Sequence, residues 1–150
     1  MINTHYRAKS NGLWVYGDLY NNCDRGVNQN FIVRDNENIG TGEHILVDSY
    51  TTGISICTMV KDRNGNLIYE GDFIKYSQHK GYMLPNFIAE VQWINDSACF
   101  GYKRNDVPNW STPTPFVEHD ELQNDFLNFV EVVGNIWDNE ISELVARHSI

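Results

Sequence analysis

The chain has 150 residues, of which 41% are hydrophobic and 13% aromatic, and its formal net charge at pH 7 is −9. This size and apolar content suit a single domain with its own core, and no apolar run approaches the roughly 18 residues that a transmembrane helix needs. We therefore expect no membrane as a partner, and because the acidic excess repels phosphate, nucleic acid is disfavoured on charge grounds. No basic segment followed by an apolar one opens the chain, which favours the cytoplasm.

The first third of the chain has the pattern of a β-rich arm, which we predict to cover residues 1–57. Aromatic and β-branched residues, which favour strands, are enriched there in short runs. The connections between the runs hold Asn, Gly and charged residues, as is typical of exposed loops. The predicted strands of this arm are residues 12–20, 31–34, 45–48 and 51–60.

The strongest hairpin signal lies at Asn64-Gly65, between two alternating apolar runs. A type I′ turn needs positive φ at both central residues, a conformation that Asn tolerates and Gly adopts without a steric penalty. We therefore predict a type I′ hairpin here. At the following bend, Gly71-Asp72, we expect the Asp72 side chain to accept a backbone N–H in an Asx-type turn.

Short strands continue beyond this hairpin. Alternation along the chain places Phe87, Ala89, Val91 and Trp93 on one face of a strand. A proline-containing loop then leads to the last part of the chain. The predicted elements of this region are strands at 66–69, 72–77, 87–95, 98–104 and 128–138, one or two helical turns at 117–126, and a helix at 140–148.

Short strands joined by tight turns and one longer loop favour a small SH3-like barrel. The predicted fold class is therefore mainly β, with the whole chain, 1–150, forming one domain. Within it we expect the β-rich arm at 1–57, the small SH3-like barrel at 58–138 and a short C-terminal helix at 139–150.

Two segments carry a resemblance to a known family. Residues 61–74 read KDRNGNLIYEGDFI, and residues 130–139 read VEVVGNIWDN. They resemble the signature hairpin and the closing motif of the YopX-like family of phage and prophage proteins. The resemblance implies an accessory protein of phage or prophage origin in a bacterial host, and it supplies no catalytic residue. The motif positions, to which we assign structural roles, are Asn64, Gly65, Tyr69, Gly71, Asp72, Gly134 and Asn135.

No pattern in the sequence indicates a catalytic, metal or cofactor site. None of the five His residues stands three or four positions from another, and we expect Cys57 and Cys99 to be buried and inert. Glu70 and Asp72 have the proximity of paired carboxylates, but a structural role for Asp72 at a bend is the stronger interpretation. We therefore predict that the protein is not an enzyme and binds no cofactor.

Two classes of function follow from these patterns. Strand edges must be covered or paired, so we predict a homo-oligomer that assembles through the β-rich arm, or a module that binds a host or phage protein. Trp110, in the proline-containing loop, is the best candidate for an interface residue. The alternative is a nucleic-acid-linked role. An aromatic groove with local Lys and Arg would favour single-strand binding, and a carboxylate row such as that at 118–125 would favour an acidic DNA mimic.

Overall fold

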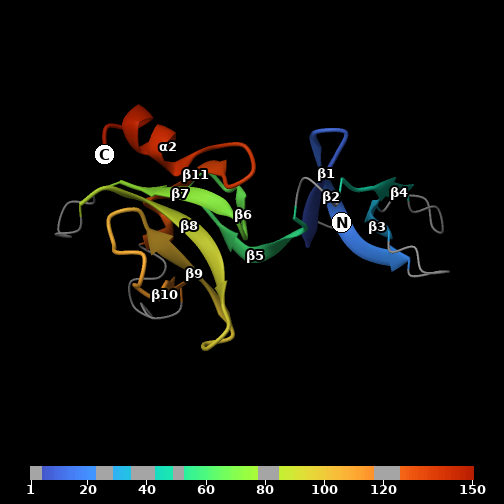
Figure 1. Cartoon of the computed structure of the whole chain (residues 1–150), viewed down its shortest axis with the longest axis horizontal. Helices are drawn as coiled ribbons and strands as arrows, with labels where there is room; N and C mark the ends of the chain where they lie inside the picture. The colour runs from blue at the N-terminus through green and yellow to red at the C-terminus, as the bar shows by residue number, and fades with distance from the viewer. Residues whose placement is uncertain (1–4, 23–28, 35–42, 49–52, 78–84, 117–125) are drawn as a thin grey trace. The chain divides into compact units, whose positions relative to one another are not determined.

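The structure of the protein is a computed structural model that describes six segments, residues 5–22, 29–34, 43–48, 53–77, 85–116 and 126–150. These segments form antiparallel β-structure with one short α-helix, which confirms the predicted mainly-β class (Figure 1). The chain divides into two units, Met1–Cys57 and Thr58–Ile150, each with a hydrophobic core. The assignment of the whole chain to a single domain stays a prediction.

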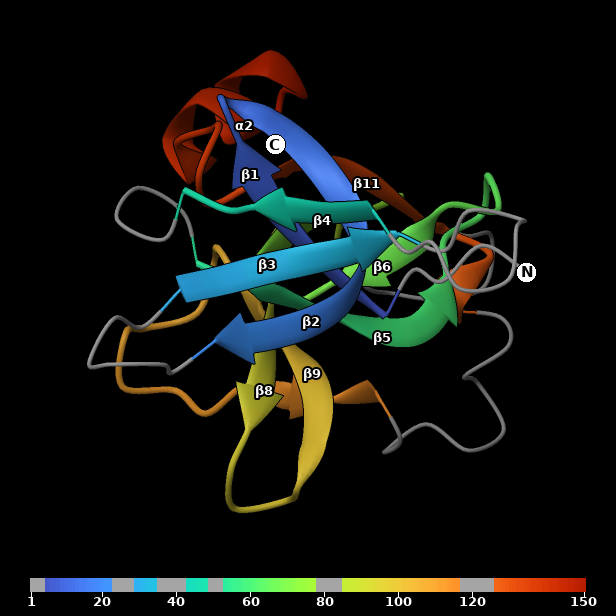
Figure 2. The ribbon, with the colours of Figure 1, turned by 90° about the vertical axis from the view of Figure 1, so that its right-hand side faces the viewer.

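A long strand, β2 (Leu13–Asn22), organises the N-terminal unit. Its first half pairs with β1 (Tyr6–Ser10), and its second half pairs with β3 (Gln29–Arg34). Strand β3 in turn pairs with β4 (Glu43–Leu46), so that it lies between β2 and β4 in Figure 2. All of these pairings are antiparallel. Strand β1 also pairs with the start of β5 (Ser55–Lys61), which continues into the C-terminal unit.

The turn between β1 and β2 is a type I′ hairpin that was not predicted from the sequence. Asn11 and Gly12 have positive φ values of 52° and 77°, and Ser10 pairs with Leu13 across them. Asn-Gly is the preferred dipeptide for this turn. The same signal therefore occurs twice in the chain, and its first occurrence indicates strand β1, which was absent from the predicted strands.

One side of the N-terminal sheet forms a small hydrophobic core. Its buried residues come from β1, β2, β3 and the segment that follows β4. Because successive side chains of a strand point to opposite faces, the neighbours of these residues lie on the other side of the sheet. The buried residues of this core are Ala8, Val15, Ile32 and Val47.

The C-terminal unit contains β6 (Leu67–Tyr69), which is hydrogen-bonded to β5, and a five-stranded antiparallel sheet. The strands of this sheet follow the order β10-β9-β8-β7-β11. Their bounds are β7 (Asp72–Tyr76), β8 (Phe87–Ile94), β9 (Cys99–Arg104), β10 (Thr114–Pro115) and β11 (Val130–Asn135).

The five-stranded sheet is open, so the predicted SH3-like barrel is not confirmed. Strands β10 and β11 end the strand order and do not pair with each other. Strand β10 has only two residues, and one of them, Pro115, has no N–H to donate. The outer side of β11 is bonded to the loop after β5, where the Arg63 N–H donates to the Val130 carbonyl at 2.9 Å. Neither strand is therefore available to close a barrel.

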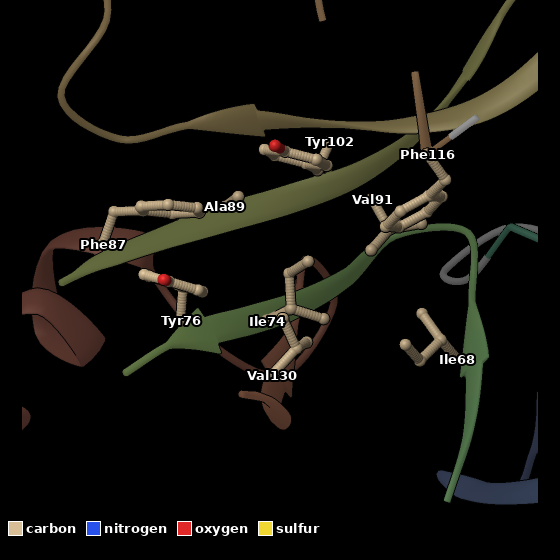
Figure 3. Packing of buried hydrophobic residues seen from close by; sticks show 9 residues of the cluster. All are labelled: Ile68, Ile74, Tyr76, Phe87, Ala89, Val91, Tyr102, Phe116 and Val130. Carbon is tan, nitrogen blue, oxygen red and sulfur yellow. The ribbon is translucent and has the colours of Figure 1, made fainter. Parts of the chain in front are cut away.

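Stacked aromatic rings fill one face of the five-stranded sheet. The Phe87 ring lies 5.1 Å from the Tyr76 ring and 5.9 Å from the Tyr102 ring, measured between centroids. The Phe126 ring adds to the stack, 5.1 Å from Tyr102. Figure 3 shows Tyr76, Phe87 and Tyr102 beside aliphatic residues of the same core. The predicted alternation along β8 explains why Phe87 points into this core.

Helix α2 (Ile141–Arg147) packs against the opposite face of the sheet, above β7 and β8 (Figure 1). Its buried residue, Leu144, contacts Phe73 and Ile88. The helix lies within the predicted range of 140–148. The helical turns predicted at 117–126 fall almost wholly outside the described residues.

Candidate interaction surface

The signature hairpin differs from the type I′ turn that was predicted. Gly65 has a φ of 82°, but Asn64 is not among the described residues with positive φ. The Gly65 N–H donates to the Asp62 carbonyl at 3.0 Å, and the Asp62 N–H donates to the Asn66 carbonyl at 2.8 Å. This is a type I turn followed by a left-handed glycine, a common three-residue hairpin loop. Asp at the first position and Gly at the fourth favour a type I turn, which explains the difference.

Asp62 holds this hairpin together, although no role was predicted for it. One oxygen of its buried carboxylate accepts the N–H groups of Asn64 and Asn66, both at 2.9 Å. The other oxygen accepts the Val132 N–H of β11 at 3.0 Å, which ties the hairpin to a strand 70 residues further along the chain. A signal for this role was present, because an Asp side chain commonly bonds the backbone two residues on.

Asp72 also accepts a backbone N–H, but from a residue that precedes it rather than one that follows. Its buried carboxylate accepts the Tyr69 N–H at 2.8 Å. Gly71 has a φ of 84°, and a Cβ at this position would lie 2.6 Å from the Trp137 ring. The Gly71 carbonyl accepts the Ile136 N–H at 2.9 Å. The bend after β6 is therefore in direct contact with the closing motif.

Asn135 shapes the closing motif as an Asx turn. Its side-chain Oδ1 accepts the N–H groups of Trp137 and Asp138, at 3.1 and 3.0 Å. Asn139 Oδ1 accepts the Asn135 N–H at 3.2 Å, and a Cβ on Gly134 would lie 2.4 Å from that same oxygen. The two motifs noted in the sequence thus form one hydrogen-bonded element of the C-terminal unit.

The N-terminal unit exposes aromatic side chains on the side of its sheet away from its core. Residues opposite each other on antiparallel strands share a face, and the register aligns Tyr20 with Phe31 and Phe31 with Leu46. Tyr20 is 49% exposed and Leu46 is 51% exposed. The His44 ring lies beside them, 5.6 Å from the Tyr20 ring and 6.4 Å from the Phe31 ring.

Two cationic side chains lie at the other end of this side of the sheet, where β2 pairs with β1. Arg7 is buried there, and its Nε donates to Ser55 Oγ at 3.2 Å. Alternation along β2 places Trp14 and Tyr16 on the same side as Tyr20. The register sets Lys9 opposite Trp14 and Arg7 opposite Tyr16. The Arg7 guanidinium and the Lys9 Nζ lie 4.5 and 5.3 Å from the centre of the Trp14 ring, which is within cation–π range. We term this set the outer face: Arg7, Lys9, Trp14, Tyr16, Tyr20, Phe31, His44 and Leu46.

A family model described as YopX protein matches residues 5–145. The chain belongs to the YopX family. This confirms the resemblance seen in the two motifs. The search of curated proteins returns no match. Among solved structures, the crystal structure of protein EF1440 from Enterococcus faecalis is similar, with a TM-score of 0.52 and 20% sequence identity over 94% of this chain and 96% of that chain. At this identity the likeness shows the fold alone.

Trp110 of this YopX chain is 85% exposed. The loop that carries it is anchored to β9, because the Lys103 Nζ donates to the Asn109 carbonyl at 2.7 Å. A second bond within the loop runs from the Ser111 N–H to the Pro108 carbonyl at 2.9 Å. The indole is therefore accessible on a loop that hydrogen bonds hold in place. The role of Trp110 as an interface residue stays a prediction.

Glu70 is influenced by Glu90 of β8 rather than by Asp72, the partner considered from the sequence. Partial burial raises the pKa of the Glu70 carboxyl, and the nearby charge of Glu90 raises it further. Both effects act in the same direction because each disfavours the ionised form. The Asp72 carboxylate, by contrast, accepts a hydrogen bond from the Tyr69 backbone N–H. The two carboxylates noted in the sequence thus have separate roles.

Among the described residues, no three His, Cys, Asp or Glu side chains are grouped to hold a metal ion. Cys57 is buried, as predicted, but Cys99 is only partly buried because it follows the exposed β8–β9 turn. Cys23 lies outside the described residues. No helix in the described part of the chain is long and apolar enough to cross a bilayer.

Proposed function

We propose that this YopX protein is a non-enzymatic accessory protein of a phage or prophage that assembles with copies of itself in the cytoplasm of its bacterial host. Membership of the YopX family supports the phage-type origin. The proposal of self-assembly rests on one observation, the edge strand β4 of the N-terminal unit. This edge differs from both edges of the five-stranded sheet.

Each edge of the five-stranded sheet is protected within the C-terminal unit. On the outer side of β11, the Val130 carbonyl accepts the Arg63 N–H and the Val132 N–H donates to the Asp62 carboxylate. At the other edge, β10 is short and contains Pro115. Short edge strands and proline are common means of preventing edge-to-edge pairing.

Strand β4 is longer than β10 and contains no proline. It has four residues and ends the strand order of its sheet. In the part of the chain that the structure describes, no strand pairs with the side of β4 that faces away from β3. The side chains of Glu43, His44 and Leu46 are exposed. Antiparallel pairing with β4 of a second copy would extend the sheet through main-chain hydrogen bonds.

Light scattering after size-exclusion chromatography tests this proposal. We expect the wild-type protein at micromolar concentration to have a mass above the 17.3 kDa of one chain. Leu46→Lys is expected to shift the protein towards the monomer, because lysine on an edge strand opposes pairing. Leu13→Lys is the matched control, since Leu13 is 72% exposed in the same unit but lies beside the β1–β2 turn.

A monomeric wild-type protein contradicts the proposal. An oligomer that Trp110→Lys dissociates, and Leu46→Lys does not, also contradicts it and assigns the interface to the Trp110 loop. The two lysine substitutions make the same change of charge at exposed apolar positions, so they separate the two surfaces directly.

The nucleic-acid-linked alternative divides into mimicry and binding. The carboxylate row that would favour an acidic DNA mimic, at 118–125, lies wholly outside the described residues. The binding form is supported by the aromatic rings of the outer face and by the Lys9 ammonium beside Trp14, whereas Arg7 is buried.

A further inference from the structure

The hydrogen bonds between β3 and β4 determine which main-chain groups of β4 point away from β3. Val47 directly follows β4, and its N–H donates to the Asn30 carbonyl of β3 at 3.1 Å. In an antiparallel strand, the main-chain groups of successive residues point alternately to the two neighbouring sides. The N–H and C=O groups of Ile45 therefore point towards β3, whereas those of His44 and Leu46 point away from it.

The alternation also shows where this edge ends. Asp48 is the next residue whose N–H points away from β3, and this N–H donates to the Lys9 carbonyl of β1 at 2.7 Å. A strand from another chain cannot use the same group. Within β4, the residues that present main-chain groups to a neighbouring strand are therefore His44 and Leu46.

Symmetry limits how two copies can pair through this edge. A two-fold axis relates two copies that use the same surface, and in a continuous sheet it runs perpendicular to the strands and keeps both outer faces on one side. Residues directly opposite each other share a face. His44 and Leu46 lie on the outer face, and Ile45 packs against the core on the inner side. The axis can therefore pass between two His44, two Ile45 or two Leu46 residues.

Of these three registers, the one centred on Ile45 pairs all the outward main-chain groups of β4. It sets His44 of each copy opposite Leu46 of the other, and each such pair exchanges two hydrogen bonds. An axis at His44 would set Leu46 opposite residue 42, which precedes β4. An axis at Leu46 would set His44 opposite Asp48, whose N–H is already donated to the Lys9 carbonyl.

We propose that two copies pair antiparallel through β4 with Ile45 at the two-fold axis, so that their N-terminal sheets become one. This inference rests on the proposed self-assembly and names its partner strand and register. Because Ile45 packs against the core of its own unit, the pair of Ile45 side chains would join the two cores. On the outer side, Leu46, which is 51% exposed, would pack beside His44 of the second copy.

Disulfide cross-linking with oxidised glutathione tests the register. In a Cys23→Ser, Cys99→Ser background, Ile45→Cys is expected to give a linked dimer of twice 17.3 kDa on a non-reducing gel. Residues opposite each other in a non-hydrogen-bonded pair have Cα atoms about 4.5 Å apart, a separation that a disulfide can bridge. Leu13→Cys, exposed in the same unit, measures linking by random collision. It should link at least about tenfold more slowly, because pairing raises the effective concentration of thiols from micromolar towards millimolar.

A mixture of His44→Cys and Leu46→Cys proteins provides a second test, which does not depend on the folding of Ile45→Cys. The register sets these two positions opposite each other, so mixed dimers should exceed the linked dimers of either variant alone. Two His44 residues would lie on the diagonal, about 7–8 Å apart, which is beyond the roughly 7 Å that a disulfide spans.

The possible outcomes separate this inference from the proposed function. Efficient linking of His44→Cys alone or Leu46→Cys alone, without mixed dimers and without linking of Ile45→Cys, overturns the register but leaves self-assembly through β4 in place. If none of these positions links faster than Leu13→Cys although the protein is larger than 17.3 kDa, the edge of β4 is not the interface and both proposals are wrong.

Discussion

The two units of this YopX protein differ in how far the faces of their sheets are covered and in how the sheet edges are protected. In the C-terminal unit, stacked rings fill one face, helix α2 packs on the other, and the edges are bonded or shortened. In the N-terminal unit, four small or aliphatic residues form the buried core, rings are exposed on the outer face, and β4 ends the sheet. From this contrast we predict that the C-terminal unit is the more stable of the two, and the exposed edge of the N-terminal unit is where we propose that contact with another copy occurs.

The largest expected difference in stability is between two substitutions, one that removes a buried ring from the C-terminal unit and one that removes an exposed ring from the N-terminal unit. Phe87→Ala should lower the free energy of unfolding by about 3–5 kcal/mol, because it leaves a cavity in the stacked core. Tyr20→Ala removes a ring of similar size from the outer face and should cost less than about 1 kcal/mol. Urea unfolding of both variants measures the contrast, and equal losses would contradict it.

Removing the carboxylate that seals β11 tests the difference between the edges. Asp62→Ala leaves the N–H groups of Asn64, Asn66 and Val132 without their acceptor, which should destabilise the unit by about 2–4 kcal/mol. Hydrogen exchange at the Val132 amide should accelerate more than exchange at β8. The variant should also associate more strongly, since its β11 edge is no longer covered. Protection of Val132 equal to that of the wild type would show that the carboxylate does not seal this edge.

Substitutions at two glycines with similar positive φ distinguish the cost of backbone strain from the cost of steric overlap with neighbouring side chains. Gly65→Ala should cost about 1 kcal/mol, because φ is positive but nothing lies within 4 Å of the added Cβ. Gly71→Ala should cost about 2 kcal/mol or more, because the added Cβ also overlaps the Trp137 ring. Gly65→Val should be worse than Gly65→Ala but still milder than Gly71→Val. Urea melting checks this ranking, and equal losses for Gly65→Ala and Gly71→Ala would contradict tight packing of Gly71 against Trp137.

The smallest effect concerns the pH dependence of the C-terminal unit. The folded-state pKa of Glu70 is raised above its ordinary value of 4.5, so its favourable contribution is present at lower pH and is lost as pH rises through the raised pKa. Relative to Glu70→Gln, the wild-type protein should therefore lose stability as pH rises above about 4.5 and through the raised pKa. The difference should shrink in a Glu90→Gln background. Parallel stability–pH profiles for wild type and Glu70→Gln would contradict this assignment.

Local signals in the sequence predicted much of the fold. Strand alternation placed Phe87 and Val91 in one core, and the motif residues around Gly71 and Gly134 lie in one hydrogen-bonded element. The turn at Asn64-Gly65 was predicted as type I′ because the dipeptide was considered without Asp62, whose side chain favours a type I turn.

Features that depend on distant residues were harder to predict. Barrel closure depends on whether β10 and β11 meet, and short alternating strands alone do not determine that pairing. The outer face needs the register of four strands to bring Lys9, Trp14, Tyr20 and His44 to one side. The spacing of Trp14, Tyr16 and Tyr20 was visible in the sequence, but the partner strands that complete the surface were not.

The hydrogen bond between Asp62 and Val132 has a consequence for synthesis on the ribosome. It joins residues that are 70 positions apart. At about 5–20 residues per second, the ribosome needs roughly 4–14 s to add the residues between them. During that interval the nascent hairpin cannot form its hydrogen bond to β11, and Gly71 cannot pack against Trp137. Translation of the closing motif is therefore the step that allows the sheet of the C-terminal unit to be completed, and a chain truncated before it would carry an unfinished, association-prone edge.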